Sequence, residues 1–155
     1  MPKLWTFGCS HVESSFNTDS VDERWPNILA EHWNMDLVNL GQIGGSNDLI
    51  LERLLDNYDK IDSDDRIIVL LTYFNRVKIL KEDLLPSDKR HENLYKILLE
   101  RPGYFTNTAI KNVLALGALL EEKDHMIFAV DPKVISALRD KGISTPKIYS
   151  WPQRK

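Results

Sequence analysis

The sequence has little of several features that mark particular classes of protein. Its 155 residues include one cysteine, Cys9, which excludes an internal disulfide framework and favours a reducing compartment. No apolar run approaches the roughly 20 residues of a membrane-spanning helix, and the first residues lack the apolar stretch of a signal peptide. The net charge of −3 gives no reason to expect a nucleic-acid partner. We therefore expect a soluble, cytoplasmic protein.

What is present is the composition of a globular domain, with 43% hydrophobic and 28% charged residues. A chain of this length can bury a sizeable core without disulfides or metals. We find no internal repeat, no low-complexity tract and no linker rich in proline, glycine or serine. The sequence therefore predicts one domain over residues 1–155.

Short apolar runs alternate with amphipathic segments along the chain. The runs predict strands at 4–7, 36–40, 66–72, 125–130 and 147–149. The amphipathic spacing predicts helices at 21–33, 47–58, 92–99, 109–123 and 133–141. Strand–helix alternation favours parallel strands with helices on both faces. We expect a three-layer α/β/α fold with a mostly parallel, four- to five-stranded, flavodoxin-like sheet.

In such sheets ligands bind at the carboxyl ends of the strands, so the segments after the first three strands are the candidates for a site. The first is Gly8-Cys9-Ser10-His11. A serine at this place exposes its hydroxyl near backbone N–H groups, which suits a nucleophile. The alternative is that Ser10 is an ordinary turn or cap residue.

The second candidate segment, residues 39–47, holds three glycines after the second strand. A free N–H group of Gly44 or Gly45 could donate a hydrogen bond to a developing negative charge. The alternative is a plain turn capped by Ser46. A phosphate-binding loop is less well matched, since neither the P-loop lysine nor the pattern G-x-G-x-x-G is present.

The third candidate segment is Thr72-Tyr73-Phe74-Asn75-Arg76. The carboxamide of Asn75 could supply a further donor to an oxyanion. The alternative is that Asn75 caps a turn and Arg76 is a solvated charge.

Together the three segments resemble the sequence blocks of the SGNH (GDSL-type) hydrolases. Thr6 to Ser10 is similar to the first block, in a cysteine-containing form like that of phage and bacterial relatives. Val38-Asn39 followed by Gly44 resembles the second block. Phe74-Asn75 resembles the third less closely, because the glycine usual near that asparagine is missing.

The resemblance implies that Ser10 is the nucleophile of an esterase or deacetylase. It also implies an oxyanion hole made by the N–H groups of Ser10 and Gly44 and the side chain of Asn75. The expected substrate is a small-molecule, lipid or sugar ester. No cofactor is expected.

The family's last block, D-x-x-H, has no counterpart here, although it supplies the general base and the carboxylate that orients it. The histidines are His11, His32, His91 and His125, and residues 126–155 contain no histidine that could belong to such a block. Three explanations stay open: the chain stops before the block, another base such as His11 acts, or the site is degenerate. A degenerate site would make the domain a binding or assembly module. A weaker alternative is a flavodoxin-like nucleotide or flavin binder.

Other features favour structural roles. Cys9 is expected to be a buried small hydrophobe, and Trp5, Trp25 and Trp33 are expected in the core. The acidic run 62–65 resembles a cation site but is more typical of a solvated turn, and we predict no metal centre.

Overall fold

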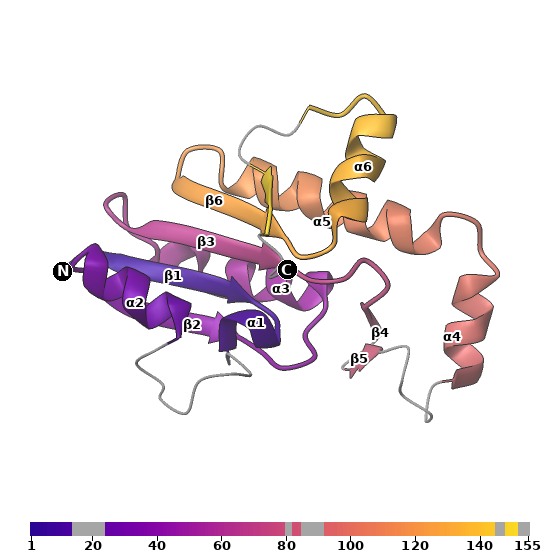
Figure 1. Ribbon diagram of the computed structural model, residues 1–155, viewed down its shortest axis with the longest axis horizontal. Helices are drawn as coiled ribbons and strands as arrows, with labels where there is room; N and C mark the ends of the chain where they lie inside the picture. The colour runs from indigo at the N-terminus through magenta and orange to yellow at the C-terminus, as the bar shows by residue number, and fades with distance from the viewer. Residues whose placement is uncertain (14–23, 80–81, 85–91, 145–147, 152–155) are drawn as a thin grey trace.

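The computed structural model describes residues 1–13, 24–79, 82–84, 92–144 and 148–151, and these form a five-stranded parallel sheet flanked by helices (Figure 1). The strand order is β2-β1-β3-β6-β7, and every pairing is parallel. The strands are β1 (Lys3–Gly8), β2 (Asp36–Gly41), β3 (Arg66–Leu71), β6 (Asp124–Ala129) and β7 (Ile148–Ser150). This order is that of flavodoxin-like sheets, so the predicted fold class is confirmed.

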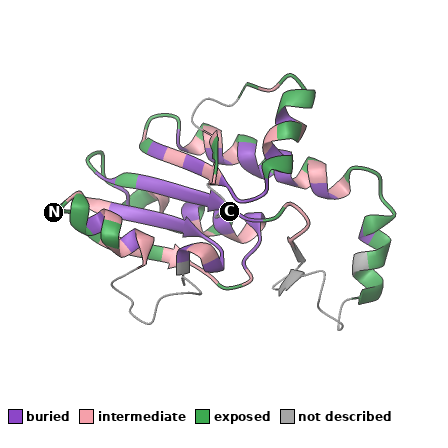
Figure 2. Cartoon of the chain, in the orientation of Figure 1, coloured by how far each residue is buried: buried purple, intermediate pink, exposed green. Residues whose placement is uncertain are grey.

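Helices cover both faces of the sheet. The helices are α1 (Ser10–Glu13), α2 (Trp25–His32), α3 (Asn47–Asn57), α4 (Glu92–Leu99), α5 (Tyr104–Leu119) and α6 (Pro132–Asp140), with a short 3-10 helix at Tyr58–Lys60. Side chains of α3, α5 and α6 share one core cluster with the sheet, and α2 packs on the other face. Figure 2 shows the central strands mostly buried and α4 mostly exposed. The continuous apolar run of β3 is buried on both faces, as expected for a central parallel strand.

Two predicted helices differ from the observed ones. The helix expected over 21–33 is α2, which begins at Trp25 with proline in its first turn; residues 21–23 lie outside the described part. The helix expected over 109–123 is α5, which begins at Tyr104 and ends at Leu119. Its first turn lies directly after Gly103, whose φ is 71°, and the buried Phe105 packs against α4 there. Tertiary packing therefore extends this helix toward the N-terminus.

The charged segment after β3 contains an antiparallel hairpin that the sequence did not predict. Its strands are β4 (Val77–Ile79) and β5 (Glu82–Leu84). The segment lacks an extended apolar run, which is the signal used for the other strands. No helix in the described part of the chain has the length and hydropathy needed to cross a membrane.

The acidic turn before β3 is only partly solvated. Asp62 and Asp64 are exposed, but Asp65 is buried and accepts hydrogen bonds from Trp5 Nε1 and the Lys3 N–H group, both at 2.7 Å. The three carboxylates lie close enough to face a cation. The prediction of a wholly solvated turn was wrong for Asp65, because two donors from β1 draw its carboxylate inward.

Candidate active site

The carboxyl ends of β2, β1 and β3 lie side by side, because the three strands are parallel neighbours in the sheet. The register pairs Gly8 with Gly41 on one side and with Leu70 on the other. The Gln42 N–H group donates to the Gly8 carbonyl at 2.9 Å. The three candidate segments therefore start from one edge of the sheet, which we call the carboxyl edge (Figure 1).

Ser10 is the first residue of α1 and is 7% exposed. The turn that places it needs a glycine two residues earlier: a Cβ at Gly8 would lie 2.3 Å from Val12 Cγ2 and 3.0 Å from the Leu70 carbonyl oxygen. Cys9 is fully buried, as predicted, and its carbonyl accepts from the Val12 N–H group. Close packing between α1 and β3 therefore fixes the position of Ser10.

The two candidate donors of the second segment differ. The Gly45 N–H group donates to the Gln42 carbonyl at 3.1 Å and closes a turn. The Gly44 N–H group has no hydrogen-bond partner among the described residues, and the φ of Gly44 is 75°, a conformation that favours glycine. Ser46 caps α3, with its hydroxyl accepting from the Leu49 N–H group, so the capping alternative also holds. Gly44 is thus the better donor of the two.

Polar side chains fasten the second segment to the first. Asn39 donates to the Val12 carbonyl at 3.1 Å and accepts from the Gly41 N–H group. Arg53 of α3 donates to the Leu40 carbonyl at 2.7 Å and also to the Gln42 side chain. The segment is therefore held from α1 on one side and from α3 on the other.

A buried asparagine joins the second and third segments. The Asn47 carboxamide accepts from the Thr72 N–H group at 2.8 Å and donates to the Thr72 carbonyl at 3.4 Å. Beyond Thr72 the chain turns, with the Arg76 N–H group donating to the Tyr73 carbonyl. Asn75 lies in this turn and is half-buried.

Among the described histidines, His11 is the one at the carboxyl edge. Burial and then the positive charge of Arg76 lower its pKa below the ordinary value of 6.5, so the imidazole is neutral at neutral pH. His32 is exposed in α2. His125 lies at the start of β6, at the opposite edge, with Nδ1 2.9 Å from the Lys123 carbonyl. His91 is outside the described residues.

Sequence reasoning missed several polar residues at this edge. Asn47 lies one position after the predicted cap Ser46, and nothing in the local sequence indicates that its side chain joins two segments. Arg76 was taken as solvated, yet it is half-buried and donates to Thr72 Oγ1 at 3.1 Å. Asp131 caps α6 by accepting from the Lys133 N–H group at 3.0 Å.

Comparisons with known proteins bear on the fold. No family model and no curated protein matches the sequence. A putative lipolytic protein of the G-D-S-L family from Desulfitobacterium hafniense is similar over 97% of this chain and 77% of its own, at 13% identity and a TM-score of 0.57. A lipolytic G-D-S-L protein from Veillonella parvula is similar over 96% of this chain and 76% of its own, at 13% identity and a TM-score of 0.49. A lipase from a goat rumen metagenome is similar over 97% of this chain and 80% of its own, at 14% identity and a TM-score of 0.49.

The first of these similarities, with the order of the parallel strands, shows that the chain has an SGNH (GDSL-type) fold. The prediction made from the three sequence blocks is confirmed at the level of the fold. At this sequence identity the likeness concerns the arrangement of elements and not the chemistry of individual residues.

Proposed function

We propose that the protein is a serine hydrolase that cleaves an ester at the carboxyl edge of the sheet. Ser10 is the nucleophile, and the N–H groups of Ser10 and Gly44 with the Asn75 carboxamide form the oxyanion hole. The observation that carries the proposal is the Gly44 N–H group: it has no partner among the described residues, at the edge where Ser10 begins α1. A preorganised donor without a partner is what a developing oxyanion requires.

The reaction follows from these groups. The Ser10 hydroxyl oxygen adds to the ester carbonyl carbon as a base removes its proton, and the carbonyl oxygen becomes an oxyanion. Collapse of this intermediate breaks the bond to the alcohol, which leaves with the proton, and an acyl-serine remains. Water then attacks the acyl-serine and releases the carboxylic acid. Each oxyanion donor typically contributes a few kcal/mol of transition-state stabilisation.

His11 is the proposed base, since it is neutral at neutral pH and follows Ser10 directly. One observation favours a second candidate function. In the serine triad a carboxylate stabilises the imidazolium that forms, whereas the charge acting on His11 is that of Arg76, a cation. This electrostatic setting weakens the base. It supports the alternative that the site is degenerate and the domain binds a ligand without cleaving it.

A fluorophosphonate probe and a p-nitrophenyl acetate assay separate the two candidates. Wild type is expected to be labelled and to release p-nitrophenol, and Ser10→Ala is expected to do neither. Ser63→Ala is the matched control, because Ser63 is exposed in the acidic turn at the opposite edge. Circular dichroism verifies that all three proteins are folded. Equal behaviour of folded wild type and Ser10→Ala would contradict the hydrolase and favour the binding module.

A further inference from the structure

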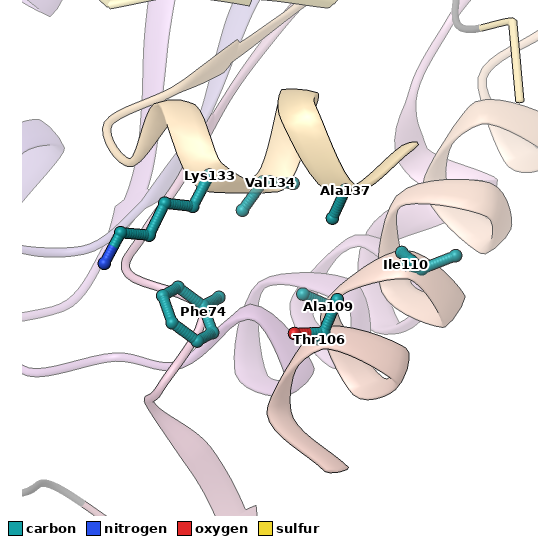
Figure 3. Close-up of a pocket in the computed structure, with 7 residues that line it drawn as sticks. All are labelled: Phe74, Thr106, Ala109, Ile110, Lys133, Val134 and Ala137. Carbon is teal, nitrogen blue, oxygen red and sulfur yellow. The ribbon is translucent and has the colours of Figure 1, made fainter. Parts of the chain in front are cut away.

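A small cavity opens beside the third segment. Its volume is about 100 Å³, room for several water molecules or a short carbon chain. It lies between α5 and α6 and is lined by Phe74, Thr106, Ala109, Ile110, Lys133, Val134 and Ala137 (Figure 3). The lining residues of α5 lie in its N-terminal half, and α6, which follows the carboxyl end of β6, contributes its first turns. The cavity therefore belongs to the carboxyl edge, and Phe74 directly precedes Asn75.

One cationic side chain, that of Lys133, lines this cavity, and another, that of Arg76, belongs to the third segment. The Lys133 ammonium lies 5.6 Å from the centre of the Phe74 ring, and Figure 3 shows it extending past that ring. The Arg76 guanidinium lies 5.1 Å from the centre of the Tyr73 ring. Its charge also reaches His11, next to Ser10.

Neither cation has a carboxylate partner within the described ranges. Arg76 donates to Thr72 Oγ1, and the side chains of both cations otherwise contact aromatic rings. The acidic residue nearest to Lys133 in sequence is Asp131, whose carboxylate accepts from the Lys133 backbone N–H group as a helix cap. Two cations that lack a carboxylate partner, one of them beside an apolar cavity, are suited to a ligand that has an apolar part and an anionic part.

We propose that the ester bound at this edge is anionic, with a short acyl group in the α5–α6 cavity and a phosphate or carboxylate on its alcohol portion against Lys133 and Arg76. This inference rests on the proposed hydrolase function. The acyl carbon chain continues from a carbonyl held by Asn75 toward the neighbouring Phe74. The alcohol portion then faces the cations on the Ser10 side of the cavity.

A matched pair of esters tests the charge preference. The anionic ester is 4-(butyryloxy)benzoate and the neutral one is 4-(butyryloxy)benzamide, so the two share the butyryl group, the ring and a single ester bond and differ mainly in charge. We expect wild type to prefer the anionic ester in kcat/KM by about tenfold, as charge-assisted hydrogen bonds are among the strong ones. Lys133→Met and Arg76→Met should each reduce this ratio several-fold. Methionine keeps an apolar stem in place of the lysine chain.

Lys111→Met is the control, since Lys111 is exposed on α5 and does not line the cavity. It should keep the wild-type ratio. Equal turnover of the two esters by wild type, or a ratio that Lys133→Met and Arg76→Met leave unchanged, would overturn the inference while the hydrolase stands.

Binding to Ser10→Ala, measured by calorimetry with the same esters, separates the inference from the proposed function. We expect tighter binding of the anionic ester, weakened when Lys133→Met is added. If wild type cleaves neither ester yet Ser10→Ala shows this preference, the hydrolase is lost and anion recognition holds. Equal affinity for both esters would overturn anion recognition whatever the turnover.

A second variant tests the place of the acyl group. Ala137→Leu fills the cavity, whereas Ala118→Leu adds the same bulk to an exposed position of α5. Each buried methylene favours binding about fourfold. Ala137→Leu should therefore remove the preference for butyryl over acetyl esters of one alcohol, and Ala118→Leu should keep it. Retention of the preference in Ala137→Leu would exclude the cavity as the acyl site.

Discussion

At the amino edge of the sheet, the carboxylates of Asp65 and Asp124 have partners within the protein, whereas at the carboxyl edge two cations lack a carboxylate partner among the described residues. Asp65 accepts from Trp5 and Lys3 at the amino edge, and Arg66 bridges to Asp124 at 3.0 Å. Arg76 and Lys133 at the carboxyl edge have no carboxylate partner among the described residues. These charged groups of the amino edge are thus engaged in holding the fold, while the two cations of the carboxyl edge can bind an anion.

The comparison predicts the largest effect for Asn75→Ala, at the carboxyl edge. If Asn75 is an oxyanion donor as proposed, its loss should lower kcat roughly a hundredfold to a thousandfold, with little change in melting temperature. Steady-state kinetics and thermal unfolding measure the two quantities. The control is Asn57→Ala, near the amino edge at the end of α3, which should keep its kcat. A large loss of stability in Asn75→Ala with an unchanged kcat would assign this residue to the fold instead.

Asp65→Ala should lower the stability of the protein and leave its activity unchanged. Removal of the carboxylate leaves the Trp5 and Lys3 N–H donors without an acceptor, at a cost of about 2–3 kcal/mol in the free energy of unfolding. Urea unfolding measures this cost, and fluorophosphonate labelling of the folded variant should not change. Asp64→Ala, in the exposed neighbour, is the control.

The stabilisation by Asp65 also depends on pH. Burial opposes the charged form, but the hydrogen bonds from Trp5, Lys3 and Asp62 outweigh it and lower the pKa of Asp65 below 3.8. The stabilisation is therefore present above pH 3.8 and is lost as the pH falls through the lowered pKa. A pH series of the same unfolding experiment should show the difference between wild type and Asp65→Ala shrinking in acid.

Gly8→Ala tests the close packing of α1 against β3 at the carboxyl edge. The new Cβ would overlap Val12 and approach the Leu70 carbonyl oxygen, so we expect a loss of about 2 kcal/mol in stability. Gly117→Ala is the matched control: nothing lies within 4 Å of its Cβ position inside α5, and alanine should stabilise the helix slightly. Similar effects of the two substitutions would refute the close packing of α1 against β3.

The pH dependence of His11 should give a smaller effect. Arg76→Gln removes one of the two causes that lower the pKa of His11, so the pKa should rise toward 6.5. A reaction that needs the neutral imidazole is lost as the pH falls through that pKa, so the acid limb of the rate profile should move to higher pH. Nuclear magnetic resonance titration of the His11 ring measures the pKa, with Arg139→Gln as the exposed control. An unchanged pKa would show that the charge of Arg76 does not reach the ring.

The smallest effect is expected for the exposed ion pair of Arg66 and Asp124. Asp124→Asn should cost less than about 1 kcal/mol, because solvent screens both charges. Thermal unfolding at low and high salt measures the loss, which should vanish at high salt. A loss of stability as large as that of Asp65→Ala would contradict the distinction between this exposed ion pair and the buried carboxylate of Asp65.

The order of strands and helices could be predicted from the sequence because each element has a local signal. The buried run of β3 and the serine cap of α3 depend on neighbouring residues, and both were predicted within one or two positions. The start of α5 was missed, because packing of Phe105 against α4 connects residues whose contact no local pattern records. The hairpin after β3 was missed because each of its strands has only three residues and includes a charged one, so neither forms an apolar run.

The sequence predicted which residues lie at the candidate site, but not the hydrogen bonds and electrostatic interactions between them. Parallel strands bring successive loops to one edge, so the placement of Ser10, Gly44 and Asn75 along that edge follows from topology. The distinction between Gly44 and Gly45 depends on which N–H group closes the turn, and this requires three-dimensional geometry. The same holds for the influence of Arg76 on His11, which follows from proximity between two separate loops.

The Asn47 carboxamide occupies the place that a neighbouring strand would have at Thr72, since it both accepts from and donates to the backbone of that residue. It thereby links the glycine loop to the start of the asparagine turn through two hydrogen bonds. A ligand that pushes one of them outward must break these bonds or displace the other as well. If the site changes shape to fit different ligands, we therefore expect the movement in elements other than these two loops.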